Sequence, residues 1–175
     1  FSLQYELCAT TVLQMLDLGG IPLRAEDRRF GDPLVIGGGP TAFNPAPLAP
    51  FFDAFALGDG EELILELAET VVRWKREGGS REDLLAAWKG LSGVYVPSLH
   101  REGDVVSRRI LADLDRADFP TGLVVPFSET VHDRVGLEIA RGCTRGCRFC
   151  QAGMVYRPVR ERKTETIARL ARKSL

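Results

Sequence analysis

A short apolar run that ends in three glycines constrains the fold of this chain more than any other feature. Leu-Val-Ile at residues 34–36 leads directly into Gly-Gly-Gly-Pro at residues 37–40. A strand that is apolar on both faces is typical of a parallel sheet covered by helices on both sides, and glycines at its end indicate a tight loop. The run therefore predicts a buried parallel strand that leads into a glycine loop.

The segments on either side of this strand alternate between helical and strand patterns. Residues 8–18 place apolar side chains at helical spacing, and residues 53–57 form a second short strand. Asp59 followed by Glu62 has the pattern of a capping box at the start of the next helix, and Ser80 is placed to cap the helix after it. Strands that alternate with helices predict an α/β fold with a parallel sheet.

The downstream half of the chain has a different pattern. Residues 93–97 and 105–110 have strand character and predict a β-hairpin. Residues 112–134 contain two prolines and a glycine and have the character of a linker. Residues 135–140 then form a new strand, and residues 164–175 a helix with one apolar side.

Charge divides the chain near the same linker. Residues 134–175 hold 11 Lys and Arg against 3 Asp and Glu, a net charge of +8, whereas residues 1–133 hold 12 against 21, a net charge of −9. Such a split indicates two units, the second of which faces an anionic group. We expect an α/β domain with a hairpin extension at 1–111, a linker at 112–134 and a second domain at 135–175.

Composition excludes several protein classes. With 45% apolar and 27% charged residues, the chain is neither disordered, collagen-like nor a disulfide-dense scaffold. No apolar run approaches the roughly 18 residues that a membrane span needs, so we expect a cytoplasmic protein. The chain begins with Phe1 in an apolar stretch and ends in a helical pattern, and it is therefore expected to be an internal fragment of a longer protein.

Three of the four cysteines form a C-x-x-x-C-x-x-C pattern directly after the strand predicted at 135–140. They are Cys143, Cys147 and Cys150. Thiolates at this spacing are suited to hold three irons of a 4Fe–4S cluster, and a missing fourth ligand leaves an open coordination site, which is typical of catalytic rather than structural metals. Interleaved arginines would offset the negative charge of the cluster.

Other interpretations of these cysteines remain open. Zinc bound by the three cysteines with His100 or His132 is one, although zinc sites usually pair one C-x-x-C with a second pair. A non-catalytic zinc or Fe–S module with a nucleic-acid-binding face is another, and a cysteine loop that stays empty is a third. The fourth cysteine, Cys8, has the character of a small buried hydrophobe. The basic residues that would form the RNA-binding face are Arg157, Arg160, Arg162, Lys163, Arg169, Arg172 and Lys173.

The cysteine pattern resembles the signature of radical S-adenosylmethionine (radical SAM) enzymes, in which the residue before the third cysteine is aromatic, as Phe149 is here. A larger set of blocks is similar to radical SAM proteins with an N-terminal cobalamin-binding-type domain. These blocks are FSLQYELCATTVLQMLDLGGIP at 1–22, VIGGGPTAFNP at 35–45, FFDAFALGDGEE at 51–62 and VHDRVGLEIARGCTRGCRFCQAGMVYR at 131–157.

The resemblance implies a fold and an activity. It implies a partial flavodoxin-like sheet with flanking helices, followed by the first strand, loop and helix of a partial TIM barrel. The three cysteines would hold a 4Fe–4S cluster whose fourth iron binds S-adenosylmethionine, with Phe149 beside the adenine. A reductant protein such as flavodoxin or ferredoxin would then drive the cleavage of S-adenosylmethionine that starts radical chemistry. The full-length protein is expected to be an enzyme, and this fragment alone to be inactive.

Cobalamin is a further cofactor that the resemblance implies. Ser2 and the loop of Gly37, Gly38 and Gly39 would line the pocket for its nucleotide tail, although Ser-Leu-Gln departs from the Ser-x-Leu order of such modules. The usual axial-ligand motif, Asp-x-His-x-x-Gly, belongs to an earlier strand. His100 and Gly103 have the spacing of this motif, but Ser98 stands where the motif has aspartate. We therefore do not predict His100 to be a cobalt ligand.

Overall fold

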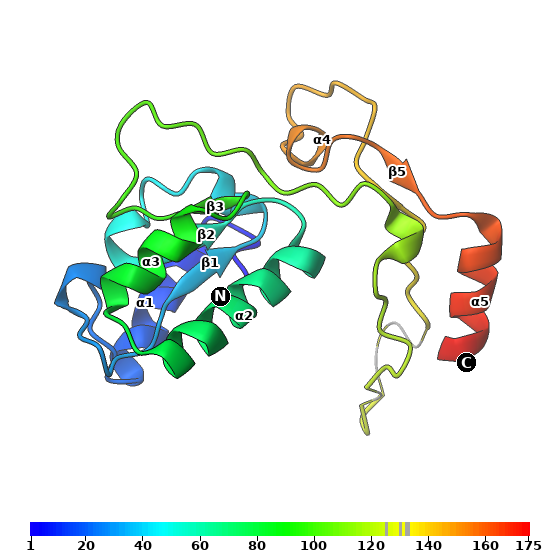
Figure 1. Cartoon of the computed structure of the whole chain (residues 1–175). Coiled ribbons are helices and arrows are strands. Elements are labelled where there is room, and N and C mark those ends of the chain that lie inside the picture. The colour runs from blue at the N-terminus through cyan, green and yellow to red at the C-terminus, as the bar shows by residue number, and fades with distance from the viewer. Residues whose placement is uncertain (125, 130, 132–133) are drawn as a thin grey trace. The chain divides into compact units, whose positions relative to one another are not determined.

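The chain folds into two units, Phe1–Ile110 and Leu111–Leu175. A computed structural model describes residues 1–124, 126–129, 131 and 134–175 (Figure 1). Within this described part, no helix combines the length and the apolar character needed to cross a membrane.

The first unit is built around a small mixed sheet in the order β1-β2-β3. Strand β1 (Ile36–Gly38) runs parallel to β2 (Ala54–Ala56), and β3 (Val94–Tyr95) runs antiparallel to β2. Ser2 forms a parallel bridge with Gly38 on the free side of β1. The two predicted parallel strands are confirmed, and the first is displaced two residues toward its glycines.

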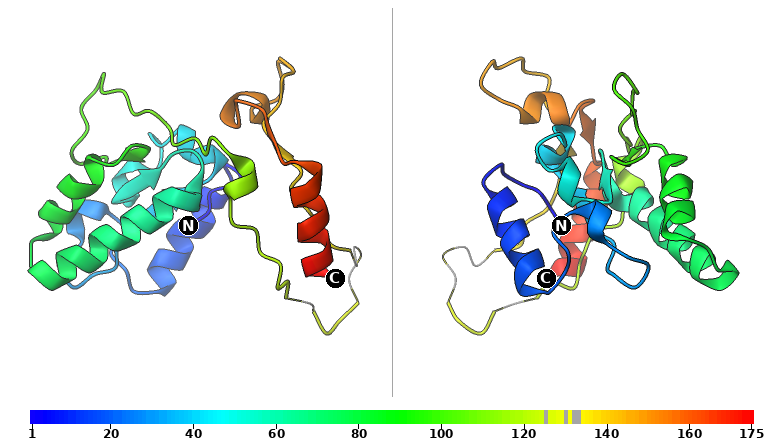
Figure 2. Two further views of the ribbon diagram at one scale, coloured as in Figure 1. Left: turned by 45° about the vertical axis from the view of Figure 1, so that its right-hand side comes forward. Right: turned by 90° about the vertical axis from the view of Figure 1, so that its left-hand side faces the viewer.

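Helices cover both faces of this sheet, as the apolar strands require. Helix α1 (Cys8–Leu18) lies on one side, and α2 (Gly60–Glu77) and α3 (Arg81–Lys89) lie on the other (Figure 2, right). Short 3-10 turns, η1 (Ala25–Asp27), η2 (Pro40–Phe43) and η3 (Ala49–Phe51), make up much of the connections. The predicted α/β class is therefore confirmed.

The core has two parts because successive strand residues face opposite sides. Phe55 packs with the α1 residues Val12 and Leu16, whereas its neighbour Ala54 packs in a cluster with Leu63 of α2 and other residues of that face. The largest fully buried side chain is Trp88 of α3, which belongs to this second cluster. Both clusters come from the apolar periodicity of the sequence.

The two predicted helix caps have different outcomes. Ser80 forms the expected cap: its hydroxyl accepts from the Asp83 amide, and the Asp83 carboxylate accepts from the Ser80 amide. Asp59 is the N-cap residue of α2, but its side chain makes no capping hydrogen bond, so the predicted capping box is wrong. Glu62 instead faces the guanidinium of Arg109 at 3.7 Å.

The predicted hairpin between residues 93–97 and 105–110 is also wrong. Residues 105–110, all of which are described, contain no strand; Arg109 makes an isolated parallel bridge to Gly58. β3 pairs with β2 instead of with its neighbour in sequence. Backbone groups of residues 57 and 59 bond to Arg109, so the segment closes against β2 and the start of α2 rather than against β3.

The second unit contains shorter elements. They are η4 (Leu114–Arg116), β4 (Ala140–Arg141), α4 (Ala152–Val155), β5 (Arg160–Glu161) and α5 (Thr164–Ser174). The predicted C-terminal helix is confirmed as α5. The strand predicted at 135–140 is present only from Ala140, and it pairs antiparallel with β5. The first strand of a parallel barrel needs a parallel neighbour to bond its backbone. The described residues of this unit contain no parallel strand, so β4 is confined to Ala140 and Arg141.

Candidate functional site

The cysteine loop connects β4 to α4 and begins at a glycine that the backbone requires. Gly142 has φ +94°, and a Cβ at this position would lie 2.5 Å from the carbonyl oxygen of Tyr156 and 2.6 Å from that of Pro158. No other residue fits so close to two carbonyl groups. Gly146, the second glycine of the loop, has open space around it, so the close approach of carbonyl groups requires a glycine only at position 142.

The three thiols are free and accessible to different degrees. Cys143 and Cys150 are half-buried and Cys147 is exposed. The Cys143 sulfur accepts a hydrogen bond from the Arg145 amide at 3.3 Å, and the Cys150 amide donates to the Cys147 carbonyl at 3.1 Å. Among the described residues, no three His, Cys, Asp or Glu side chains converge as a metal-holding group. The loop thus supplies three potential metal-ligand thiols, but their sulfur atoms do not converge on one point.

A hollow of about 410 Å³ is lined by this loop and the start of α4. Cys147 and Cys150 line it, together with Arg145, Arg148 and Met154. Phe149 also lines the hollow, and its side chain is 92% exposed. An aromatic ring this exposed is available for stacking, and two nearby guanidinium groups favour an anionic group in the hollow.

The chemistry of this donor set fits an Fe–S cluster, although the sulfur positions do not yet form its site. Thiolates are the usual protein ligands of such clusters, and hydrogen bonds to sulfur tune them. The backbone N–H of Arg145 already donates to one of the sulfurs. The described residues bring no histidine together with these thiols, and three thiols alone do not complete a closed zinc site.

An arginine immediately before the loop pairs with a nearby carboxylate. Arg141 makes two hydrogen bonds to the Glu138 carboxylate, at 2.9 and 3.0 Å. These bonds, and to a lesser degree the charge of Arg162, hold the pKa of Glu138 below its ordinary value. The Arg141 guanidinium is thus engaged with Glu138, whereas Arg145 and Arg148 are the arginines that lie between the cysteines in the sequence.

Two arginines of the predicted basic tail form the interior of the second unit. Arg160 donates to the carbonyls of Leu111, Tyr156 and Pro158. Arg162 donates to the carbonyls of Leu114, Ala117 and Glu138, and its guanidinium lies 5.7 Å from the Phe119 ring centroid. Both arginines are buried. Sequence reasoning missed this role because a buried arginine is rare unless its donors are satisfied, and no apolar pattern marks it.

The RNA-binding alternative loses support from the same contacts. Arg160 and Arg162 are buried, so their side chains are not part of a basic surface. Tyr156, the aromatic residue of that segment that could stack on a base, is half-buried. The remaining basic side chains are exposed and are consistent with a solvated face. They are Arg157, Lys163, Arg169, Arg172 and Lys173.

The residues predicted to line a cobalamin pocket lie together at the end of β1, where packing accounts for two of the glycines. A Cβ on Gly37 would lie 3.0 Å from side-chain atoms of Leu3, Phe52 and Phe55, and one on Gly39 would lie 2.8 Å from the Leu3 carbonyl oxygen. Gly38 pairs with Ser2. Gly37 and Gly39 thus allow the core and the Leu3 backbone to approach β1 closely.

His100 and the fourth cysteine, Cys8, belong to the first unit, whereas the cysteine loop belongs to the second. His100 Nδ1 lies 3.0 Å from the backbone nitrogen of Val96, and its ring packs against Tyr95 with the ring planes tilted by 42°. His132 lies outside the described residues. Cys8 is the first residue of α1 and is half-buried rather than fully buried as predicted.

Comparison with known proteins gives the family. A family model described as "Radical SAM proteins, N-terminal" matches residues 1–97. The uncharacterized protein MJ0966 of Methanocaldococcus jannaschii is 33% identical over 153 residues, which cover 83% of this chain and 30% of that protein. The chain thus spans less than a third of that relative's length. No solved structure matches the chain. Because the family match covers more than half of its residues, the chain belongs to the radical SAM proteins.

Proposed function

We propose that the whole protein is a radical SAM enzyme that binds a 4Fe–4S cluster through Cys143, Cys147 and Cys150. The observation that carries this proposal is the presence of three free thiols within eight residues of one loop, in a chain that belongs to this family. The family match ends before this loop, at residue 97, so the loop's chemistry supports the assignment independently of that match.

The chain's own residues have defined tasks in this proposal. Gly142 and the bonded pair of Arg141 and Glu138 fix the start of the loop, and the Arg145 amide stabilises the Cys143 thiolate by a hydrogen bond. Phe149 stacks on the adenine of S-adenosylmethionine. When bound, the cluster supplies the electron that cleaves the sulfonium of S-adenosylmethionine and so begins radical chemistry on the substrate.

The proposal extends to the architecture of the whole protein. The parallel pair β1 and β2, covered by helices on both faces, supports a flavodoxin-like first domain over residues 1–111. Residues 135–175 would open a partial TIM barrel. The contacts of Arg160 and Arg162 with residues 111–117 favour joining those residues to the second domain, so that the first domain would end at residue 110. The linker would then begin after residue 117 rather than at 112.

A cobalamin site remains a prediction of the resemblance, at the edge where Ser2 and Gly38 pair. The packing roles of Gly37 and Gly39 weaken its support, because those glycines are needed without any ligand. Equilibrium dialysis of the full-length protein with hydroxocobalamin tests it. Stoichiometric binding that Gly38→Val abolishes would support the site, and absence of binding would remove cobalamin from the proposed mechanism.

Anaerobic reconstitution with iron and sulfide tests the cluster. The full-length protein should turn brown and hold about four irons per chain. Cys143→Ala, Cys147→Ala and Cys150→Ala should each lose most of the iron, whereas Cys8→Ala, the matched control from the first unit, should keep it. A colourless protein that holds one zinc through these cysteines would contradict the proposal and favour the non-catalytic module.

A further inference from the structure

A cavity of about 690 Å³ lies in the first unit, at the amino ends of the parallel strands. Phe52 and Asp53, which directly precede β2, line it, as do residues 97–99, which follow the antiparallel β3 and so reach the same edge. The Gly37–Gly39 loop is at the opposite, carboxyl end of β1. This cavity is therefore separate from the edge at which cobalamin is predicted.

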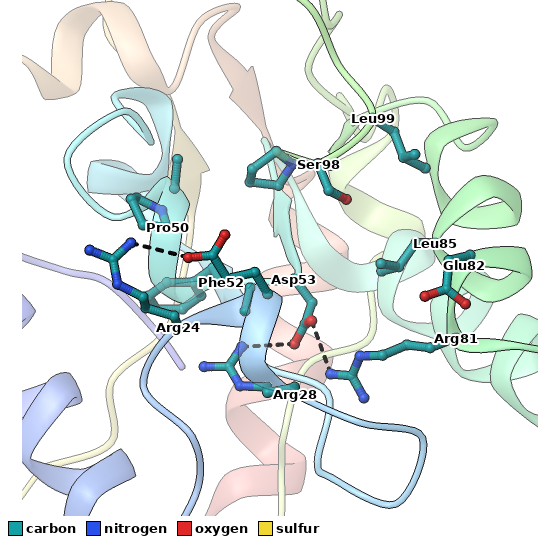
Figure 3. Close-up of a pocket in the computed structure, with 14 residues that line it drawn as sticks. Arg24, Arg28, Pro50, Phe52, Asp53, Arg81, Glu82, Leu85, Ser98 and Leu99 are labelled. Atoms are coloured by element: carbon teal, nitrogen blue, oxygen red, sulfur yellow. Dashed lines mark hydrogen bonds and ion pairs between the residues drawn. The ribbon is translucent and has the colours of Figure 1, made fainter.

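Three buried charged side chains form the floor of the cavity. The guanidinium groups of Arg28 and Arg81 approach the Asp53 carboxylate from two sides, at 3.0 and 2.9 Å (Figure 3). The side chains of Arg28 and Asp53 are at most 2% exposed, and that of Arg81 is 8% exposed. Asp53 Oδ2 also accepts from the Val35 amide at 2.7 Å. Two buried cations thus share one carboxylate whose oxygens are both engaged.

This floor carries an excess of positive charge. Burial is the largest influence on the pKa of the Arg28 guanidinium and lowers it, and the charge of Arg81 lowers it further. The Asp53 carboxylate raises this pKa by more than Arg81 lowers it, and Asp32 raises it slightly.

The other guanidinium N–H groups of Arg28 and Arg81 donate to backbone carbonyls, such as those of Phe51 and Pro33, which satisfy the donors but leave the positive charge. Among the described residues, Arg81 Nε is a donor without a hydrogen-bond partner, and it is fully enclosed. Two guanidinium charges face one carboxylate, and a buried charge is stabilised by a partner of opposite sign, so an anion on the cavity side of this floor is favoured.

The walls above the floor are largely apolar. Pro50 and Leu85 lie on opposite sides in Figure 3, and Phe52 and Leu99 complete the apolar lining. The rim carries both signs of charge. Arg24 and Glu26 are exposed and 3.5 Å apart, and Glu82 of α3 is an exposed carboxylate.

We propose that this cavity binds a small organic anion, with its carboxylate or phosphate group toward Arg28 and Arg81 and its apolar body against Phe52 and Leu85. A cavity of this size suits a small-molecule ligand, and apolar walls with a few convergent polar groups are typical of such sites. The rim carboxylate Glu82 opposes the anion and the rim guanidinium of Arg24 attracts it.

Calorimetric titration of the full chain with benzoate, phenyl phosphate and the uncharged benzamide tests the proposal. Benzoate or phenyl phosphate should bind at least about tenfold more tightly than benzamide, and whichever of the two binds more tightly gives the anionic group. Inorganic phosphate should bind more weakly than phenyl phosphate, because it lacks the apolar body. Equal affinity for benzoate, phenyl phosphate and benzamide, or binding by none of them, would overturn the proposal.

Rim and wall variants locate the bound anion without disturbing the buried network. Glu82→Gln should tighten binding and Arg24→Gln should weaken it, each by about twofold, whereas Glu69→Gln on the exposed side of α2 should change nothing. Leu85→Trp, which fills the cavity from its half-buried wall, should abolish binding. An affinity that Leu85→Trp leaves unchanged would place the anion elsewhere and contradict the proposal.

Discussion

The two units of this chain are stabilised in different ways. In the first unit, apolar side chains from α1, α2 and α3 fill both faces of a sheet. In the second unit, the apolar cluster of Leu111, Leu114 and Ala117 is small, and buried arginines join distant segments through backbone carbonyls. Apolar packing depends on shape and volume, whereas the arginine network depends on satisfied hydrogen bonds. Mutations should therefore act on the two units through different mechanisms.

The largest expected effect is at Gly58 in the first unit. Gly58 has φ +103°, and a Cβ there would lie 2.0 Å from the Arg109 carbonyl oxygen. Gly58→Ala should lower the free energy of unfolding by about 3–5 kcal/mol, because backbone atoms must separate. Denaturant titration followed by fluorescence of Trp74 and Trp88 measures this. Gly60→Ala, whose site is open, should be nearly neutral; equal losses in the two variants would contradict the account of Gly58.

The next effect is at Arg162 in the second unit. Arg162→Met keeps the apolar stem but leaves the carbonyls of Leu114 and Ala117 without this donor, at an expected cost of about 3 kcal/mol. Hydrogen exchange of the Arg162 backbone amide, which donates to Ile139, should accelerate in the variant. Arg172→Met on the exposed side of α5 is the control. If methionine preserved the protection at residue 162, the second unit would be held by apolar packing like the first.

A smaller effect compares the two helix starts of the first unit. Ser80→Ala removes the cap of α3 and should destabilise the unit by about 1 kcal/mol. Asp59→Ala at the start of α2 should cost less, because the Asp59 side chain makes no capping bond. Tryptophan fluorescence in denaturant measures both variants. A larger loss from Asp59→Ala would show that its side chain stabilises α2 by another contact.

The smallest effect is a pH dependence of the second unit. The folded pKa of Glu138 is depressed below its ordinary value of 4.5, chiefly by its hydrogen bonds to Arg141. Its contribution is therefore present above the unfolded pKa and is lost as pH falls through the depressed folded value. Because the group is partly exposed, the change should stay below about 1 kcal/mol. Glu138→Gln should remove this acid dependence in hydrogen exchange of the second unit, and Glu165→Gln should retain it.

Apolar periodicity made most of the first unit predictable. The helix at Cys8–Leu18 is confirmed to the residue, β2 lies within the apolar run at 53–57, and β1 begins at Ile36, the last residue of its run. The hairpin at 93–110 was wrong because strand character does not determine which strand is the partner. β2 was free on one side, and β3 paired there.

The second unit was harder to predict because its stabilising residues are charged. Charge counting assigned Arg160 and Arg162 to an exposed basic face, whereas they donate to the carbonyls of Leu111 and Leu114, 49 and 48 residues away in sequence. The cysteine triplet was readable because the ligands of one cluster are close in sequence. Their sulfurs do not converge among the described residues, so the cluster site itself stays a proposal.

Electron paramagnetic resonance of the reduced, reconstituted full-length protein, recorded with and without S-adenosylmethionine, tests the central proposal most directly. If three cysteines leave one iron open, S-adenosylmethionine should change the cluster signal in wild type and in Cys8→Ala. Cys150→Ala should give no such signal. A cluster signal that S-adenosylmethionine leaves unchanged would mean that all four irons already have other ligands, and it would contradict the proposed function.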